Sequence, residues 1–272
     1  MSKLIFRIQL SEIVLLHKTE NMKTAELHDT IVAELVASDY RTAEIFKKHG
    51  IDFCCGGKKT IGKVCEEKNV DIEELESEIF ALHNLPKDEE HNYNQWSLSF
   101  LIDYIVNVHH PYINKNIDNI TEYAQKVARV HGDHNPETKD IAKLWDDLVM
   151  ELTMHMKKEE LVLFPYMKNI ERYSKGDLKE FPSSHFGTVR NPIRMMENEH
   201  DLAGNLMKHI EALSNDFTVP EHACNTYRVL YAKLKEFQND LHQHIHLENN
   251  ILFPKAAEME NTFAIRKNSY SL

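Results

Sequence analysis

Several residue types are scarce in this sequence, and each shortage excludes a class of protein. There are only eight glycines and eight prolines in 272 residues, which disfavours a many-turned β-sheet protein and favours long helices. The four cysteines (Cys54, Cys55, Cys65 and Cys224) are too few for the disulfide framework of a small secreted protein. No run approaches the ~18–20 consecutive apolar residues that a membrane-spanning helix needs, so we expect no membrane partner.

Positive charge is also in short supply. Lysine and arginine together number 32 against 43 aspartates and glutamates, which gives a net charge of −11. Because no basic face offsets this charge, the sequence argues against nucleic acid as a partner. The apolar N-terminal stretch is interrupted by Arg7 and Glu12, and no small-residue cleavage site follows it. We therefore expect a cytoplasmic protein.

The chain divides into two helical regions, and the expected fold class is all-α. The expected segments are an extension that is disordered or precedes the true start (1–21), a small helical N-terminal domain with a Cys-Cys motif (22–83), a linker (84–94), a helical bundle (95–260) and a tail (261–272). Four long segments without strand-like alternation predict an antiparallel four-helix bundle. These segments span roughly residues 96–130, 137–172, 191–213 and 221–258.

One eleven-residue phrase occurs twice in the predicted bundle. HMKKEELVLFP begins at His155, and HIHLENNILFP begins at His244, 89 positions later. In both copies a glutamate follows the histidine by four residues (Glu159 and Glu248), so on a helix the two side chains share one face. Both pairs continue an apolar stripe, where burying an unpaired carboxylate costs several kcal/mol. Multivalent metal ions would balance both charges at once.

Spacing within the repeat predicts two further ligands. His200 lies on the apolar stripe of the third helix, 44 residues before His244. The matching histidine in the first half is His110, 45 residues before His155. Helical phase alone leaves both His109 and His110 open as ligands, and the spacing favours His110. We expect His109 and the remaining histidines to lie at the surface or to support the ligands from a second layer, with His109 and His131 as the first candidates for an exception.

Six donors suit two metal ions better than one. The candidate metal ligands are four histidines and two glutamates, namely His110, His155, Glu159, His200, His244 and Glu248. Imidazole and carboxylate donors in a bundle core, without cysteine, favour iron over manganese or zinc. We expect each half of the repeat to give two histidines to one ion, with both glutamates bridging the pair. Open coordination positions would then remain for chemistry.

The same segments resemble a known family. RTAEIFKKHGIDFCCGGKKTI (residues 41–61) resembles the small N-terminal domain of the repair of iron centres (RIC) family. VHGDHNPET, HMKKEELVLFP, MMENEHDLAGN and HIHLENNILFP resemble its hemerythrin-like bundle in order and spacing. The departures are the extra residues 1–21 and the unusual His109-His110-Pro111 surrounding of the first ligand.

This resemblance implies a cytoplasmic, stress-induced bacterial protein that restores iron–sulfur clusters damaged by nitric oxide or peroxide. It implies a non-haem, carboxylate-bridged site with two iron ions, formed by the same six side chains. The implied partners are damaged iron–sulfur proteins as clients, with nitric oxide or dioxygen as small ligands.

The adjacent Cys54 and Cys55 are the candidate catalytic residues. The glycines and lysines that follow (residues 56–59) favour exposed thiolates, and a disulfide between neighbouring cysteines would be strained. We interpret them as a redox-active or iron-transferring thiol pair. The alternative is a pair of small buried apolar side chains, which is how we interpret Cys65 and Cys224.

Three functions fit the predicted site. The first is donation of iron to a damaged cluster. The second is enzymatic, the reductive coupling of two nitric oxide molecules to nitrous oxide with electrons from the thiol pair. The third is a carrier or sensor of dioxygen or nitric oxide, which would leave the thiol-bearing domain without a role. The sequence leaves open the clients, the reductant and whether the protein is a homodimer.

Overall fold

The structure, a computed structural model, describes residues 24–85 and 92–269. Within these ranges every regular element is helical, and the only β-type pairing is an isolated bridge between Ile31 and Thr60. The expected all-α fold class is therefore confirmed. None of the helices described has both the length and the apolar character that a membrane crossing requires. The expectation for residues 1–21 falls outside the described ranges.

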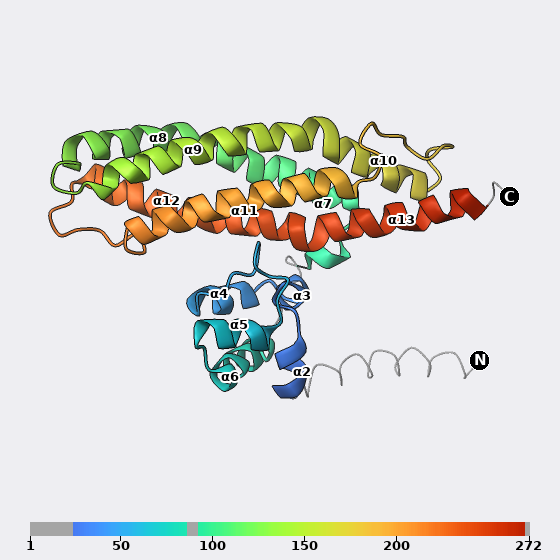
Figure 1. Cartoon of the computed structure of the whole chain (residues 1–272), viewed down its shortest axis with the longest axis horizontal. Helices are drawn as coiled ribbons and strands as arrows, with labels where there is room; N and C mark the ends of the chain where they lie inside the picture. Colours follow the sequence, from blue (N-terminus) through green and yellow to red (C-terminus); the bar gives the residue numbers. More distant parts are fainter. Residues whose placement is uncertain (1–23, 86–91, 270–272) are drawn as a thin grey trace. The chain divides into compact units, whose positions relative to one another are not determined.

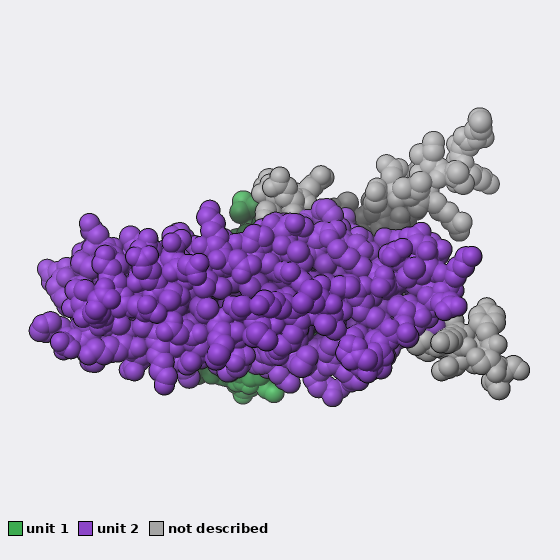
Figure 2. Space-filling model, turned by 90° about the horizontal axis from the view of Figure 1, so that it is seen from above, with its two compact units in different colours: residues 1–92 green, residues 93–272 purple. Residues whose placement is uncertain are grey.

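The chain divides into two compact units between Asn92 and Tyr93, and Figure 2 colours them separately. The described part of the first unit consists of short helices (Figure 1): α2 (Thr24–Asp29), α3 (Val32–Ser38), α4 (Thr42–Lys48), α5 (Ile61–Lys68) and α6 (Ile72–His83).

Local signals account for where these short helices begin and end. The side chain of Thr60 accepts a hydrogen bond from an amide in the first turn of α5, and Asp71 does the same for α6. Gly50 follows α4 with a φ of 65°, a conformation that glycine adopts without a steric penalty. The long segment between α4 and α5 carries the paired cysteines.

The second unit is built from four long helical rods (Figure 1), as expected for a four-helix bundle. In chain order its elements are η2 (Tyr93–Gln95), α7 (Leu98–Tyr104), η3 (Ile105–His109), α8 (His110–His131), α9 (Glu137–Lys158), η4 (Glu159–Leu163), α10 (Phe164–Ser174), α11 (Arg190–Leu213), α12 (Asn225–Leu247), η5 (Glu248–Leu252) and α13 (Phe253–Ser269). α9 packs against α8 and α11, and α8 also packs against α12. The fourth rod continues to Ser269, beyond the expected end at residue 258.

Three of these rods contain one π-helical turn each, namely η3, η4 and η5. The first residue after each turn bonds through its amide to the carbonyl five residues back, and the next residue is a proline. Proline has no amide to donate and crowds the preceding helical turn, and a wider turn accommodates this defect. The wider π-helical turn of η3 holds one more residue than an α-helical turn. Its effect is that the adjacent His109 and His110 both point into the bundle and are buried.

Glu260 on α13 stabilises the start of α11 through hydrogen bonds. Its carboxylate is 5% exposed and accepts hydrogen bonds from the amide of Val189 at 2.9 Å, from the hydroxyl of Tyr166 at 2.8 Å and from the hydroxyl of Thr188. One buried charge thus satisfies two buried donors and the half-buried hydroxyl of Thr188, and it complements the positive end of the α11 dipole.

We expect Glu260→Ala to destabilise the protein by about 3 kcal/mol, because it leaves the buried amide of Val189 and the buried hydroxyl of Tyr166 without this acceptor. Urea unfolding followed by circular dichroism measures the change. The control is Glu258→Ala, on the same helix but exposed, which should alter stability by less than ~0.5 kcal/mol. Equal stabilities of the two variants would contradict the assignment.

Candidate metal centre

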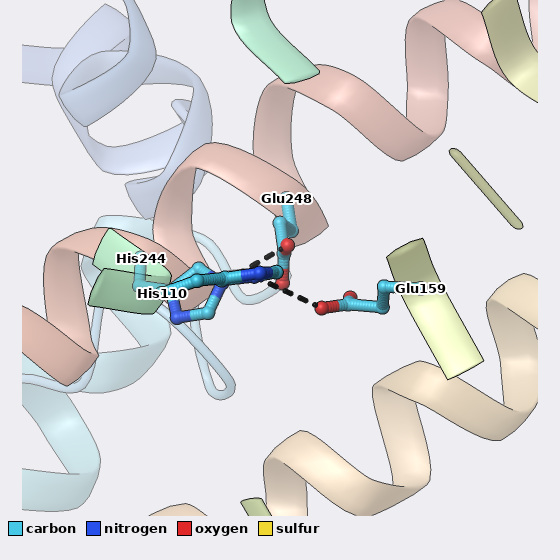
Figure 3. A group of neighbouring side chains, drawn as sticks. All are labelled: His110, Glu159, His244 and Glu248. Carbon is cyan, nitrogen blue, oxygen red and sulfur yellow. Dashed lines mark hydrogen bonds and ion pairs between the residues drawn. The ribbon is translucent and has the colours of Figure 1, made fainter. Parts of the chain in front are cut away.

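The six candidate ligands converge inside the bundle, and each is at most 2% exposed. They form two sets of four that share both glutamates, namely His110, Glu159, His244 and Glu248, and His155, Glu159, His200 and Glu248. Within each set the ligand atoms all lie within 4.8 Å of one another. Figure 3 shows the first set, in which the two carboxylates lie beside each other and beside the rings of His110 and His244.

The histidines pair differently from the expectation that each half of the repeat supplies one ion. His110 pairs with His244, and His155 pairs with His200, so each set takes one histidine from each half. The reason is the packing of the bundle, which places α8 against α12 and α9 against α11. The expectation that both glutamates belong to both sets agrees with this geometry.

Each glutamate lies between the two sets. One oxygen of Glu159 is 3.2 Å from Nε2 of His155, and the other is 3.4 Å from Nε2 of His110. In the same way, one oxygen of Glu248 is 3.1 Å from Nε2 of His244, and the other is 3.0 Å from Nε2 of His200. A carboxylate placed in this way can contribute one oxygen to each of two ions.

The electrostatics favour negative charge on both glutamates. Burial and the nearby Glu248 raise the pKa of Glu159, but the imidazoles of His155 and His110 outweigh them and hold it below its usual value. Burial alone would lower the pKa of His155, but Glu159 and the other carboxylates around it raise it to about 10. The site is therefore arranged for two carboxylates balanced by positive charge, carried by protons on the imidazoles or by metal ions.

Unpaired ligand atoms show that this donor set fits metal ions. Nε2 of His244 and one oxygen of Glu248 form a hydrogen bond, but neither oxygen of Glu159 has a hydrogen-bond partner among the described residues. The same is true of Nε2 of His110 and of the other oxygen of Glu248. Buried polar atoms normally find partners, so several unpaired ones aimed at one point indicate an ion.

In three of the candidate ligand histidines, Nδ1 forms a hydrogen bond on the side of the ring away from the shared glutamates. The acceptors are Glu160 for His110 at 2.6 Å, Glu199 for His155 at 2.9 Å and Asn249 for His200 at 2.8 Å. Metal-binding histidines typically donate their second ring nitrogen in this way, which fixes the tautomer and raises the basicity of the ligating nitrogen.

The segment that carries the paired cysteines folds back on α3. The carbonyl of Gly57 accepts a hydrogen bond from Ala33 at 2.9 Å, and a Cβ on Gly57 would lie 2.4 Å from the carbonyl oxygen of Phe53. Only glycine allows this close approach. As a result Cys54 is 5% exposed, whereas Cys55 is half-buried, and neither forms a disulfide. Cys65 is buried as expected, but Cys224 is exposed, so its interpretation as a buried side chain is wrong.

Two comparisons with known proteins bear on this arrangement. Residues 28–83 match the model of the ScdA_N domain, a domain of unknown function (DUF542), and residues 101–256 match the hemerythrin HHE cation-binding domain. The iron-sulfur cluster repair protein YtfE of Yersinia pseudotuberculosis serotype O:1b (strain IP 31758) is 38% identical over 220 residues, which cover 81% of this chain and 93% of that protein. YtfE of Yersinia pestis (strain Pestoides F) is 37% identical with the same coverage. The chain belongs to this family of iron–sulfur cluster repair proteins.

Within the hemerythrin HHE domain, the sequence analysis did not predict the three residues that accept hydrogen bonds from Nδ1 of the histidines. Glu160 and Asn249 each directly follow a shared glutamate, so the repeat itself held a signal for them. Glu199 lies outside the repeated phrase, so the repeat held no signal for its contact with His155, which is 44 residues away in sequence. Its pKa is lowered to about 2, mainly by the hydrogen bond to His155.

Among the described residues, two histidines outside the ligand sets are buried, which excludes the surface, one of the two locations expected for them. His109 is 1% exposed, and its Nδ1 lies 3.0 Å from a carboxylate oxygen of Asp240. His246 is fully buried beside Asn250, and burial lowers its pKa to about 3. His246 therefore remains neutral at physiological pH.

In the ScdA_N domain, the expectation of an exposed thiolate is wrong for Cys54. The carboxylate of Asp52 accepts hydrogen bonds from the amides of Cys54 and Cys55 and lies 3.2 Å from the sulfur of Cys54. The contact with Cys55, burial and the charge of Asp52 all raise the pKa of the Cys54 thiol well above its usual value. The two sulfurs are 3.9 Å apart, and because Cys54 is buried while Cys55 is half-buried, Cys55 is the more accessible member of the pair.

We therefore expect iodoacetamide to modify Cys55 before Cys54. Because the pKa of Cys54 is raised, its thiolate is scarce at neutral pH, and its alkylation rate should keep increasing with pH above 9. Asp52→Asn removes a neighbouring negative charge and should accelerate alkylation of Cys54 at pH 8 severalfold, whereas Glu67→Gln, an exposed acid of the same unit, should not. Tandem mass spectrometry resolves the two sites. Equal rates for both cysteines at pH 7 would refute this assignment.

Proposed function

We propose that this protein repairs damaged iron–sulfur clusters by donating iron held as a carboxylate-bridged, non-haem pair inside the bundle. The observation that carries the proposal is the placement of Glu159 and Glu248, which are fully buried and shared between two sets of imidazoles. The relatives named iron-sulfur cluster repair protein support the activity, and the hemerythrin HHE match supports cation binding.

In this proposal His110 and His244 hold one ion, His155 and His200 hold the other, and both glutamates contact each ion. Nitrogen and oxygen donors bind ferrous iron without the thiolates that hold it in iron–sulfur clusters. Cluster assembly sites with thiolates can therefore compete for ions held in this way. The protein's own residues bind the cargo, exclude solvent from it and balance its charge.

The thiol pair is proposed to act in the transfer itself. Cys55 offers the accessible sulfur, and Asp52 positions the backbone of both cysteines. Cysteines that form no disulfide are typical of a reducing compartment, which supports a cytoplasmic location beside the clients.

Transfer of labelled iron to a damaged client tests the function. The full-length protein is loaded with ⁵⁷Fe(II) without oxygen and mixed with a [3Fe–4S]⁺ ferredoxin that has lost one iron, with dithionite as the electron donor. One Fe(II) and one electron then rebuild the [4Fe–4S]²⁺ cluster. Mössbauer spectroscopy should find the label in the client, and a chelator that captures iron in solution should not prevent the transfer.

The Glu248→Leu variant should transfer much less iron, because it lacks one of the shared carboxylates. Absence of label in the client would refute iron donation. A separate incubation with nitric oxide and an excess of an electron donor, because each nitrous oxide formed consumes two electrons and two protons, addresses the enzymatic alternative. Formation of many nitrous oxide molecules per protein, without loss of iron, would favour that alternative.

A further inference from the structure

The two sets of ligands differ in the hydrogen bonds that Nδ1 of each histidine makes and in how exposed the acceptors are to solvent. In the set with His155 and His200, the acceptors are Glu199, whose side chain is 18% exposed and also bonds Lys158, and Asn249, which is 6% exposed. Both rings are therefore fixed by groups that are themselves largely removed from solvent.

The set with His110 and His244 is held less firmly. The acceptor for His110 is Glu160, whose side chain is 43% exposed, so water competes for it. His244 is 1% exposed, and its Nδ1 has no hydrogen-bond partner among the described residues. One ring thus has a solvent-exposed support, and the other has none from the described part of the chain.

Loss of a hydrogen bond behind a metal-binding histidine typically reduces metal affinity about 10–100-fold. The missing support at His244 therefore predicts weaker binding by this set of ligands. The shared glutamates cannot compensate, because each contributes to both sets.

A fifth imidazole lies beside this weaker set. The ring of His109 stacks on that of His244, with centroids 5.4 Å apart and an angle of 6° between the planes. Asp240 holds its Nδ1, while its Nε2 is buried and has no hydrogen-bond partner among the described residues. The π-helical turn η3 brings His109 inward together with His110. This carboxylate-supported imidazole with an unpaired nitrogen resembles a metal ligand, yet it belongs to neither set.

We propose that the two subsites are unequal, that the ion held by His110 and His244 is the one delivered, and that His109 takes it over as it leaves. The delivery part rests on the proposed function, whereas the inequality of the subsites does not. The ion between His155 and His200 then stays behind and preserves the bundle core after the first ion has gone.

The order of iron release tests this proposal. The full-length protein loaded with two Fe(II) ions is exposed to ferrozine without oxygen. Iron should leave in two phases of equal amplitude, with rates that differ about 10–100-fold. Protein recovered after the first phase is crystallised, and anomalous scattering at the iron edge locates the remaining ion. We expect it between His155 and His200. An ion remaining between His110 and His244, or equal loss from both subsites, would overturn the proposal.

Matched variants separate the contributions. Glu199→Gln should accelerate only the slow phase, about tenfold, and Glu160→Gln should accelerate only the fast phase. His109→Phe keeps the ring shape but lacks the nitrogen, and should slow the fast phase severalfold while both ions still bind. An unchanged fast phase would overturn the step assigned to His109. The ferrozine experiment involves no client protein. A release order other than the expected one would therefore contradict this proposal without contradicting the proposed function in cluster repair. Release in the expected order without transfer to a client would overturn only the proposed function.

Discussion

Replacing Glu159 by leucine is expected to leave at most one iron ion per chain. The carboxylate is fully buried and contacts one histidine of each set, so its loss removes a ligand from both subsites. The fold should survive, because replacing a buried charge with an apolar side chain of similar volume is often neutral or stabilising. Elemental analysis of anaerobically reconstituted protein measures the iron content.

The adjacent acid provides the control for this variant. Glu160 lies next to Glu159 in sequence but bonds only the outer nitrogen of His110. Glu160→Gln should therefore still bind two ions at saturating iron. Circular dichroism should show that both variants are folded. Two irons retained by Glu159→Leu would refute the assignment of this carboxylate as a bridge.

Removal of iron is expected to have the largest effect on stability. Ions that bind only the folded chain stabilise it by about 4 kcal/mol each when the free ion is at a thousandfold its dissociation constant. Two ions then contribute about 8 kcal/mol, which is comparable with the total stability of many domains. Anaerobic urea unfolding with and without iron should show a large shift of the midpoint.

A variant that lacks both shared carboxylates provides the control for the stability measurement. Glu159→Leu combined with Glu248→Leu should show almost no shift on addition of iron. A midpoint unchanged by iron in the natural chain would contradict a buried metal centre. An equal shift in the double variant would place the ions elsewhere.

The sequence predicted the shared carboxylates and all four histidines of the cluster. A histidine and a glutamate four residues apart necessarily share a helix face, so the period of the helix was sufficient to place Glu159 near His155. The internal repeat then extended the set to His110 and His200. Helical phase and repeat spacing are local properties of the chain, which is why they could be deduced without a structure.

Features that depend on packing between helices were not predictable in this way. The pairing of His110 with His244 follows from the contact of α8 with α12, which no local pattern encodes. Glu199 reaches His155 across the bundle for the same reason. Cys54 was expected to be exposed because glycines and lysines follow it, but the turn at Gly57 folds the segment onto α3 and buries the thiol.

A crystal structure of the iron-loaded protein, with anomalous scattering measured at the iron edge, tests the central claim most directly. The account predicts two iron peaks, roughly 3.5–4 Å apart as in other two-metal sites, with Glu159 and Glu248 each touching both. A single peak, or glutamates whose oxygens contact only one ion each, would contradict it.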